Sequence, residues 1–443
     1  MISLTGSTRV LFINPSYWTM KKKPLGYVNL STIPLGLGYI AAALELDGVY
    51  STIIDMNFLE MKTNDLKQRI EQVKPNIVGI SSMSSNYQNA VDVAKSIKSW
   101  FPETTIVLGG VHATFMYEEI LNSVPEIDVI VRYEGEITFS QLVKTIENRG
   151  DLKTVKGIAF RDENRKVVTT PQMELVEDLD SLPFPAYHLI EPTVEEYIGK
   201  HKIRAFPLLT TRGCPYDCIF CSTTALHGRK YRTRSVSNII EHIEYLIDTY
   251  RINTISFADD NFTMQQDRIF ELCNQIKKHN LSIQWGCSTR TDLLSTKLLR
   301  KMKEAGCNNL FFGIESASEK VLKIIKKGVS IAHSKKIVKQ AEKLGIKTHC
   351  SFILGLPGET SESLNDIIKF IKETKPTGRV LPNLLENHPG TELYQTVGKQ
   401  FNQSQIPFPD IAQTQIEMLL TFYKQKSKTD ELIKVIPPDI VVK

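Results

Sequence analysis

Residues 210–221 read TTRGCPYDCIFC and hold three of the chain's seven cysteines. These three, Cys214, Cys218 and Cys221, follow a C-x3-C-x2-C spacing. The mostly apolar run at 205–210, just before them, is typical of a short buried strand. The cysteines are therefore expected on a loop at the carboxyl end of a strand, where α/β proteins place their chemistry.

Three thiolates at this spacing predict a metal centre, because soft sulfur ligands select an iron–sulfur cluster, zinc or copper(I). A structural zinc site needs a fourth protein ligand, and His227 and Cys287 are poorly placed to supply it. A [4Fe–4S] cluster held by three cysteines instead keeps one iron open for a substrate or cofactor. The alternatives are buried core cysteines or a disulfide. The tight spacing and the flanking Gly213 and Pro215 count against both.

The motif resembles the cluster loop of radical S-adenosylmethionine (SAM) enzymes, in which an aromatic residue, here Phe220, precedes the last cysteine. In that family the open iron binds the amino and carboxylate groups of SAM. An electron from the cluster then cleaves SAM to methionine and a 5′-deoxyadenosyl radical. The resemblance implies that Cys214, Cys218 and Cys221 are cluster ligands and that Phe220 lies near the adenine.

The bulk composition is that of an ordinary globular protein: 443 residues, 42% apolar and 23% charged. This length allows two or three domains. The net charge of +5 is spread along the chain and does not indicate a nucleic-acid partner. The sequence shows neither an apolar run of membrane-spanning length nor the layout of a signal peptide. Seven cysteines without a repeating framework favour a reducing compartment, so a cytoplasmic location is expected.

The first 150 residues alternate short apolar runs with amphipathic stretches, which is the signature of a doubly wound parallel sheet. Strands are expected at 9–14, 50–55, 76–81, 105–110 and 128–132. Helices are expected at 36–47, 66–73, from after 81 to 100, and at 138–147. The expected fold class is therefore α/β, beginning with a Rossmann-like or flavodoxin-like parallel sheet in residues 1–150.

Ligands of such sheets bind outside the carboxyl ends of the strands. Small, hydroxyl-bearing and flexible residues gather at those ends, and the candidates are Ser81, Ser82, Met83, Gly109, Gly110, His112, Glu134 and Gly135. Glycine after a strand lets a ligand approach the backbone closely. The residues alone predict a ligand site at this edge without identifying the ligand.

These segments, preceded by PLGLG at 34–38, resemble in their order the cobalamin-binding domain that is fused ahead of many radical SAM enzymes. The resemblance implies that the same edge residues contact cobalamin. The chain lacks the D-x-H-x-x-G motif of cobalamin-dependent mutases. The lower face of a bound corrin is therefore expected to carry no histidine, and a loop role for His112 is at least as consistent as cobalt ligation. The alternative is a domain of the same fold that binds nothing.

Residues 151–200 are expected to form a hairpin, 157–160 with 166–169, and a Pro-rich connector. From about residue 201 the pattern restarts as strand–helix units. Strands are expected at 206–211, 254–258, 282–288, 309–314, 347–354 and 379–385. That number and order predict a partial (βα)6 barrel of the TIM type over residues 201–395, open on one side. Residues 396–443 are assigned to a C-terminal tail.

Polar residues again follow the strands of the predicted barrel. By resemblance to the family, Asp259 and Asp260 bind the SAM amino group, Arg290 its carboxylate, and Glu315 its ribose or amino group. Gly355 lies in the segment whose backbone receives the adenine. Alternatively, the two aspartates cap the start of the next helix. Arg290 and Glu315 could instead form salt bridges within the barrel. The four remaining cysteines are expected to pack in the core.

The resemblance implies an enzyme with three cofactors: a [4Fe–4S] cluster, SAM and cobalamin. The first hypothesis is methylation of an unactivated carbon of a small molecule, by way of a 5′-deoxyadenosyl radical and methylcobalamin. An external flavodoxin or ferredoxin would supply electrons. Hydrogen abstraction by a radical needs no general base, so no catalytic side chain is assigned.

Three other functions remain as alternatives. The same machinery also serves cyclisation, ring contraction or oxidation without methylation. A non-enzymatic carrier of the cluster or corrinoid would not need the predicted SAM pocket. A transfer-RNA methylthiotransferase is disfavoured, because those relatives carry three further cysteines in the N-terminal domain, whereas the first cysteine here is Cys214. The substrate itself is not legible in the sequence.

Overall fold

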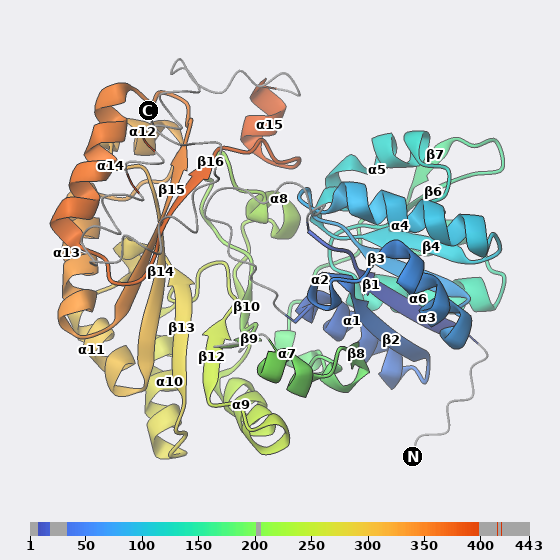
Figure 1. Cartoon of the computed structure of the whole chain (residues 1–443), viewed down its shortest axis with the longest axis horizontal. Coiled ribbons are helices and arrows are strands. Elements are labelled where there is room, and N and C mark those ends of the chain that lie inside the picture. The colour runs from blue at the N-terminus through green and yellow to red at the C-terminus, as the bar shows by residue number, and fades with distance from the viewer. Residues whose placement is uncertain (1–7, 18–32, 201–204, 398–413, 415–417, 419–443) are drawn as a thin grey trace. The chain divides into compact units, whose positions relative to one another are not determined.

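The computed structural model describes residues 8–17, 33–200, 205–397, 414 and 418. The chain divides into two compact units (Figure 1). Unit 1 comprises the described residues up to 200, and unit 2 comprises those from 205 onward. Nearly all of the predicted tail, 396–443, lies outside the described residues.

Unit 1 is built on one sheet, in which the described residues form eight strands in the order β7-β6-β5-β4-β3-β1-β2-β8. The strands are β1 Arg9–Asn14, β2 Tyr50–Asp55, β3 Ile77–Ser81, β4 Thr105–Gly109, β5 Val129–Val131, β6 Ile158–Arg161, β7 Val167–Thr169 and β8 Ile190–Glu191. All pairings are parallel except β5 with β6 and β6 with β7. The order β2-β1-β3-β4-β5 is that of flavodoxin, whose ligand edge is centred between the first and third strands.

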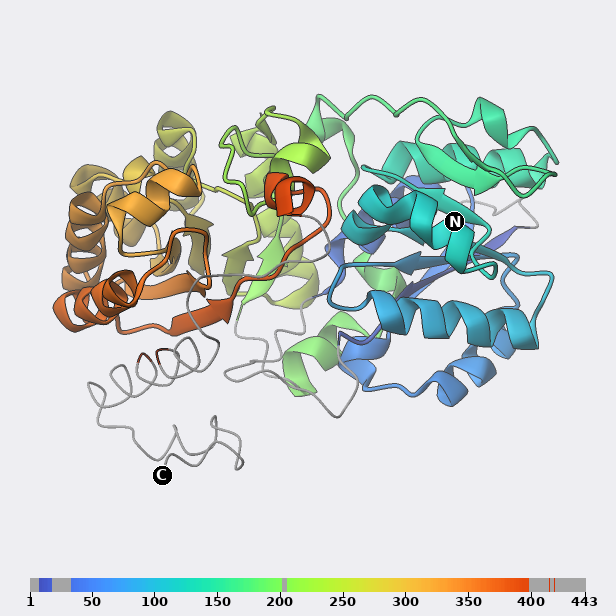
Figure 2. The same ribbon diagram turned by 90° about the horizontal axis from the view of Figure 1, so that it is seen from above.

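Helices cover both faces of this sheet (Figure 2). They are α1 Leu35–Leu46, α2 Met56–Leu59, α3 Thr63–Val73, α4 Tyr87–Trp100, α5 Val111–Ser123, α6 Glu136–Glu147 and α7 Val194–Lys200. Leu11 and Ile13 of β1 belong to the core beneath α3, α4 and α5. Phe12, between them, packs on Phe139 of α6, with ring centroids 4.9 Å apart. Burial on both faces explains why the predicted strand reads as an unbroken apolar run.

The segment after α6 extends the sheet of unit 1 at both edges. The predicted hairpin is present as β6 and β7, and it continues the sheet antiparallel beyond β5. The predicted Pro-rich connector contains β8, which pairs parallel with β2 at the opposite edge. On α7, the Tyr197 hydroxyl donates a hydrogen bond to the fully buried Asp55 carboxylate, which also accepts a 2.9 Å bond from the Asn14 amide. The connector is therefore packed into unit 1.

Unit 2 contains six parallel strands in its described residues, in the order β16-β15-β14-β13-β12-β9. They are β9 Phe206–Leu208, β12 Thr254–Phe257, β13 Gln284–Thr289, β14 Cys307–Glu315, β15 Lys347–Leu354 and β16 Val380–Leu384. A two-stranded antiparallel ribbon, β10 Thr211–Arg212 with β11 Arg232–Thr233, follows β9. Within the described residues β9 and β16 are the two edges and do not pair, so the predicted open, partial barrel is confirmed.

Unit 2 has longer helices that line the outside of this curved sheet and short helices that lie in its connecting segments (Figures 1 and 2). They are α8 Thr223–His227, α9 Val236–Tyr250, α10 Gln266–Lys278, α11 Thr296–Glu304, α12 Glu319–Ile324, α13 Ile331–Lys343, α14 Ser361–Thr374 and α15 Glu392–Val397. Four of these helices have a serine or threonine as the N-cap residue. Ser235, Ser295, Ser330 and Thr360 each accept a hydrogen bond from the backbone NH three residues later.

Short 3-10 helices occupy Leu152–Thr154, Leu179–Ser181, Tyr187–Leu189 and Thr291–Leu293. In the part of the chain that the structure describes, no helix has both the length and the apolar character needed to span a bilayer.

Candidate functional site

The strand predicted at 206–211 is divided into β9 and β10, and the cysteine loop follows β10, beyond the carboxyl end of β9. Unit 2 holds this loop from two sides. The Ile219 NH donates to the Ile325 carbonyl (3.2 Å), and the Ile219 carbonyl accepts from the Leu393 NH (2.9 Å). The Cys221 NH closes a turn on the Cys218 carbonyl (3.0 Å). The loop is thus fixed by backbone bonds to segments more than 100 residues away.

Gly213, one residue before the first cysteine, has a conformation that only glycine adopts without strain. Its φ is +93°, and a Cβ there would lie 2.1 Å from the Lys230 carbonyl oxygen. The close approach brings the ribbon β10–β11 against the start of the loop. Gly213 therefore sets the direction in which Cys214 leaves the strand.

The three sulfurs of the loop lie close enough for their charges to interact. Cys221 acts electrostatically on both Cys214 and Cys218, and burial raises the pKa of these last two thiols. Among the described residues, no group of three histidine, cysteine or acidic side chains is arranged around a single metal ion. All seven cysteines are described, and none forms a disulfide. Three soft donors on one loop fit the [4Fe–4S] cluster predicted from the sequence.

Asp259 supports the strand that leads into the cysteine loop. Asp259 is only 3% exposed. Its carboxylate accepts hydrogen bonds from the Thr210 NH (2.6 Å), the Thr211 NH (2.8 Å) and the Thr210 hydroxyl (2.5 Å). The Arg268 guanidinium donates to the same Thr210 hydroxyl (2.6 Å). Burial raises the pKa of Asp259, and the Thr210 bonds and Arg268 oppose this. These contacts give Asp259 a structural role, in contrast to the SAM contact expected from the sequence.

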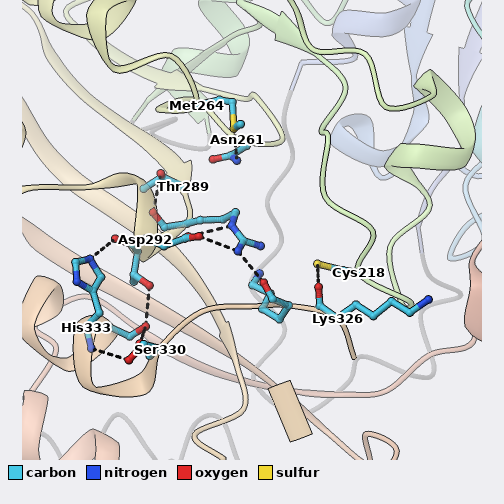
Figure 3. Close-up of polar contacts among 12 residues, drawn as sticks. Cys218, Asn261, Met264, Thr289, Asp292, Lys326, Ser330 and His333 are labelled. Atoms are coloured by element: carbon cyan, nitrogen blue, oxygen red, sulfur yellow. Dashed lines mark hydrogen bonds and ion pairs between the residues drawn. The ribbon is translucent and has the colours of Figure 1, made fainter. Parts of the chain in front are cut away.

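Asp260 and Asn261 follow β12 on the side of the cysteine loop. The Thr223 hydroxyl, 3.4 Å from the Cys221 sulfur, also lies 3.4 Å from an Asp260 carboxylate oxygen. Asn261 is buried, and its amide contacts the Met264 sulfur (3.7 Å; Figure 3). The Asn261 Oδ1 has no hydrogen-bond partner within the described part of the chain. A buried acceptor in this position fits a ligand that donates a hydrogen bond, such as an amino group.

Arg290 directly follows β13, at the strand end that the sequence predicts, and hydrogen bonds hold its guanidinium in a fixed plane. It makes two bonds to Asp292 (3.0 and 2.9 Å) and one to the Lys327 carbonyl (2.7 Å), and it lies 3.6 Å over the Tyr216 ring of the cysteine loop. Figure 3 draws the contacts at Asp292 as dashed lines. Its third nitrogen, Nη1, is buried and has no partner among residues that the structure describes. This unsatisfied donor fits a carboxylate ligand.

Glu315 ends β14 with a positive φ of 64° and forms a largely buried ion pair. Its Oε1 lies 3.3 Å from the Lys327 Nζ, and that ammonium sits 6.0 Å from the centre of the Phe220 ring. The structure thus joins two predicted residues, Glu315 and Phe220, through a lysine that the sequence did not single out. Lys327 stands in the run KKG at 326–328, where both lysines have the appearance of an exposed helix end.

Gly355 starts a turn that Glu359 closes. The buried Glu359 carboxylate accepts bonds from the Gly355 NH (2.6 Å) and the Leu356 NH (3.2 Å). These two NH groups are therefore occupied, so a ligand at this turn would meet the carbonyls and side chains instead. Burial raises the pKa of Glu359 to about 7, and the two NH bonds oppose the rise.

The raised pKa of Glu359 predicts a pH-dependent stability. In the unfolded chain the carboxyl ionises near its ordinary pKa of 4.5. Between that value and about 7 the folded state keeps a proton that the unfolded state has lost. The free energy of unfolding therefore falls as pH rises through this window, by about 3 kcal/mol in total. Glu359→Gln keeps an acceptor oxygen and removes the ionisation, so this part of the decline disappears.

Urea unfolding at pH 5 and pH 8 measures the effect. Glu362→Gln, at an exposed position in the first turn of α14, is the matched control and keeps the wild-type pH dependence. A Glu359→Gln protein with the same loss of stability between the two pH values as wild type would contradict the prediction.

The predicted ligand edge of unit 1 is formed by turns after β3 and β4 that bond to each other. The Ser82 NH donates to the Gly109 carbonyl (2.8 Å), and the His112 NH donates to the Ser82 carbonyl (3.2 Å). Gly110 has φ +97°, and a Cβ there would lie 2.5 Å from the Ser82 oxygen. The Ser82 hydroxyl is fully buried without a hydrogen-bond partner in the described residues. Such a hydroxyl at a flavodoxin-type edge fits a polar ligand.

His112 and Met83 occupy the outer part of the same edge. The His112 Nδ1 lies 3.0 Å from the Ser84 hydroxyl, and its ring stacks on Tyr87 with centroids 4.3 Å apart. Met83 is largely exposed, and its sulfur accepts a contact from the Tyr17 hydroxyl (3.7 Å). The first two contacts tie His112 of α5 to the turn after β3 and to the start of α4.

The remaining residues of this edge make contacts within unit 1. Ser81 ends β3 and pairs with Gly109 of β4. Glu134 accepts a bond from the Val176 NH (3.1 Å), and Gly135 packs so closely on Ile40 that a Cβ would lie 2.7 Å from its side chain. The buried Asn14–Asp55–Tyr197 cluster at the ends of β1 and β2 was not predicted, because Tyr197 lies far away in the sequence.

Two family models match the chain. Residues 208–371 match the radical SAM superfamily, and residues 22–143 match the B12 binding domain. The first range begins in β9 and includes the cysteine loop and the ends of β12 to β15. The second includes the turns around Ser82 and Gly110.

Several curated relatives cover most of the chain. The uncharacterized methyltransferase PH0819 of Pyrococcus horikoshii is 35% identical over 82% of this chain and 78% of the relative. An anaerobic magnesium-protoporphyrin IX monomethyl ester cyclase of Rubrivivax gelatinosus is 33% identical over 83% and 66%. A cytidylyl-2-hydroxyethylphosphonate methyltransferase of Streptomyces wedmorensis is 30% identical over 81% and 75%.

Among solved structures, the radical SAM methyltransferase TsrM from Kitasatospora setae, with cobalamin and a [4Fe–4S] cluster bound, aligns with a TM-score of 0.75. The alignment covers 98% of this chain and 90% of that one at 16% identity, so the likeness is one of fold. The two matched domains, the relative at 35% identity and the shared fold show that this chain belongs to the cobalamin-binding radical SAM family.

Proposed function

We propose that this chain is a cobalamin-dependent radical SAM enzyme that methylates an unactivated carbon of a small molecule. The observation that carries the proposal is the rim of unit 2, where the cysteine loop lies against an arginine with one unsatisfied buried donor. The methyltransferase names of the relatives from Pyrococcus and Streptomyces support the choice of methylation.

Different residues of unit 2 would bind the cluster and SAM. Cys214, Cys218 and Cys221 would hold the cluster. Arg290, through its unsatisfied Nη1, would bind the carboxylate of SAM, and the Asn261 oxygen would accept from its amino group. When bound, the cluster supplies the electron that cleaves SAM reductively, and the corrin supplies a carrier for the methyl group.

The contribution of the protein is to hold these groups and to limit the access of water. Asp292 and the Lys327 carbonyl fix the plane of Arg290 before any ligand arrives, so little rotational freedom is lost on binding. The Phe220 ring covers the Lys327 ammonium on the loop side. Asp260 and Glu315 remain candidates for further polar contacts. Gly355 is a candidate through its carbonyl, because its NH is bonded to Glu359.

We propose that residues 1–150 form the cobalamin-binding domain, 151–200 a hairpin and connector, 201–395 the radical SAM barrel, and 396–443 a tail. Ser82 and the Gly109–Gly110 turn would meet the corrin or its nucleotide tail. His112, already bonded to Ser84, would leave the lower face of cobalt without a histidine. Paramagnetic resonance of the Co(II) protein tests this, because nitrogen superhyperfine splitting from the protein would contradict it.

An external one-electron donor, such as a reduced flavodoxin or ferredoxin, is part of the proposal. So is a reducing compartment such as the cytoplasm, in which seven unpaired cysteines remain reduced.

The decisive experiment uses protein reconstituted anaerobically with iron, sulfide and cobalamin. It is given SAM bearing a deuterated methyl group, a reductant and candidate small molecules. Formation of 5′-deoxyadenosine together with a product that carries the labelled methyl is the expected result. Formation of 5′-deoxyadenosine with a changed but unlabelled product would replace methylation by the second candidate.

That second candidate is a cyclisation or oxidation by the same residues. The relative from Rubrivivax, a cyclase at 33% identity, favours it. No SAM cleavage at all by cluster-loaded protein would leave only a carrier role.

A further inference from the structure

Two adjacent lysines next to the cysteine loop differ sharply in their surroundings. The Lys327 side chain is 9% exposed, and its ammonium lies 3.3 Å from Glu315 and 6.0 Å from the Phe220 ring centre. The Lys326 side chain is 51% exposed and pairs with Glu392 at 2.7 Å. One chain segment therefore presents one cation to the interior and one to solvent.

The buried lysine is held next to the cysteine loop by its own backbone. The Ile325 carbonyl accepts from the Ile219 NH (3.2 Å), and the Lys326 carbonyl lies 3.9 Å from the Cys218 sulfur. The Lys327 carbonyl accepts from Arg290 (2.7 Å). Gly313 leaves room for the ion pair, since a Cβ there would lie 2.3 Å from the Glu315 Oε1 and 3.3 Å from the Lys327 Nζ.

We infer that Lys327 tunes the reduction potential of the cluster carried by this loop, as a buried fixed cation that favours the reduced state. The Lys327 ammonium lies 6.0 Å from the centre of the Phe220 ring, and Phe220 stands between Cys218 and Cys221 in the loop. A charge in a water-poor site acts far more strongly than one that solvent and salt screen, so Lys326 has little such effect. The inference rests on the proposed cluster and concerns a group that the sequence did not assign.

The redox step is a simple one-electron transfer. An external one-electron donor is oxidised by one electron, the cluster takes up that electron, and no atom or proton moves. The reduced cluster carries one more negative charge than the oxidised cluster, so a nearby cation stabilises it and raises the midpoint potential. Removing the cation makes reduction harder, and removing the carboxylate of Glu315 makes it easier.

The test is a redox titration of full-length, cluster-reconstituted protein without SAM, followed by the paramagnetic signal of the reduced cluster. Lys327→Met is expected to lower the reduced-to-oxidised ratio at a fixed potential by about 3- to 10-fold, the upper figure corresponding to about 59 mV for one electron. Lys327→Arg is expected to restore the wild-type ratio. Lys326→Met, which removes the same charge from the adjacent residue, is the matched control and is expected to leave the ratio unchanged.

Glu315→Gln is expected to raise the midpoint potential of the cluster, opposite to the effect of Lys327→Met. If the Lys327→Met protein does not take up a cluster, the Glu315→Gln midpoint alone tests the inference. Equal midpoints in the Lys327→Met and Lys326→Met proteins, at wild-type iron content, would overturn the inference. So would a Glu315→Gln midpoint at or below wild type. Failure of the proposed function looks different: it appears as missing cluster iron in the wild-type protein, or as cluster-loaded wild-type protein that forms no labelled product from SAM, whatever the midpoints of the variants.

Discussion

Replacing Cys218 by alanine is expected to reduce 5′-deoxyadenosine formation from SAM at least about 100-fold, equivalent to about 2.7 kcal/mol or more of barrier. The reason is that Cys218 is one of only three sulfur donors on the loop. Its sulfur lies beside the Lys326 carbonyl, and the charges of Lys327 and Arg290 act on it. With two thiolates left, the loop lacks its third sulfur donor, and iron content should fall with activity.

Cys273→Ala separates this effect from the general loss of a thiol. Cys273 is fully buried in α10, and burial raises the pKa of its thiol to about 12, so it remains protonated in the core. Its replacement should cost about 1 kcal/mol of stability and leave iron content unchanged. Iron and sulfide analysis with quantified 5′-deoxyadenosine is the measurement. Wild-type SAM cleavage by well-folded Cys218→Ala protein would refute the assignment of the cluster.

The second large effect is expected at Asp259. Alanine there removes the acceptor of three bonds from Thr210 and Thr211 and leaves the buried Arg268 without its carboxylate neighbour. Losing one partner of a buried, hydrogen-bonded charged group typically costs about 3–5 kcal/mol. The free energy of unfolding of unit 2 should fall by that amount. Cluster content should fall as well, because the two threonines lead directly into the cysteine loop.

Trp285 is a suitable reporter for this measurement. It is fully buried and lies 5.4 Å from Phe257, the strand residue two places before Asp259. Urea unfolding is followed by fluorescence in a background in which the two other tryptophans, Trp18 and Trp100, are phenylalanine. Asp248→Asn, at an exposed position on α9, is the control and should change stability by less than about 0.5 kcal/mol. An Asp259→Ala protein as stable as this control would show that the threonine bonds do not support the fold.

Much of the fold was legible in the sequence because its strands are buried on both faces. Continuous apolar runs mark such strands, and β1, β2 and β15 have the predicted bounds without change. Helix α5 was not predicted. It begins directly after Gly110 and carries aromatic residues in its middle, with a break in helical geometry at Met116. Strand β8 was missed because two residues among prolines carry no periodic signal.

The sequence predicted where the candidate site lies, but only part of its contacts. The cysteine spacing identified the loop, and the ends of β12 to β15 carry the expected residues. Sequence could not decide which of two adjacent aspartates turns inward, and the structure turns Asp259 inward. Nor could it distinguish Lys326 from Lys327, since burial of one of two neighbouring lysines depends on the positive φ of 54° at Lys326. Such choices depend on tertiary contacts and not on local pattern.

Strand β8 and helix α7 determine where a fragment containing unit 1 can end. A recombinant fragment that stops near residue 150 would expose the edge of β2 that β8 covers and would strip the Asp55 carboxylate of its tyrosine neighbour. A fragment carried through α7 keeps both. A fragment meant for purification and titration with a corrinoid should therefore extend to about residue 200, some fifty residues beyond the end of α6.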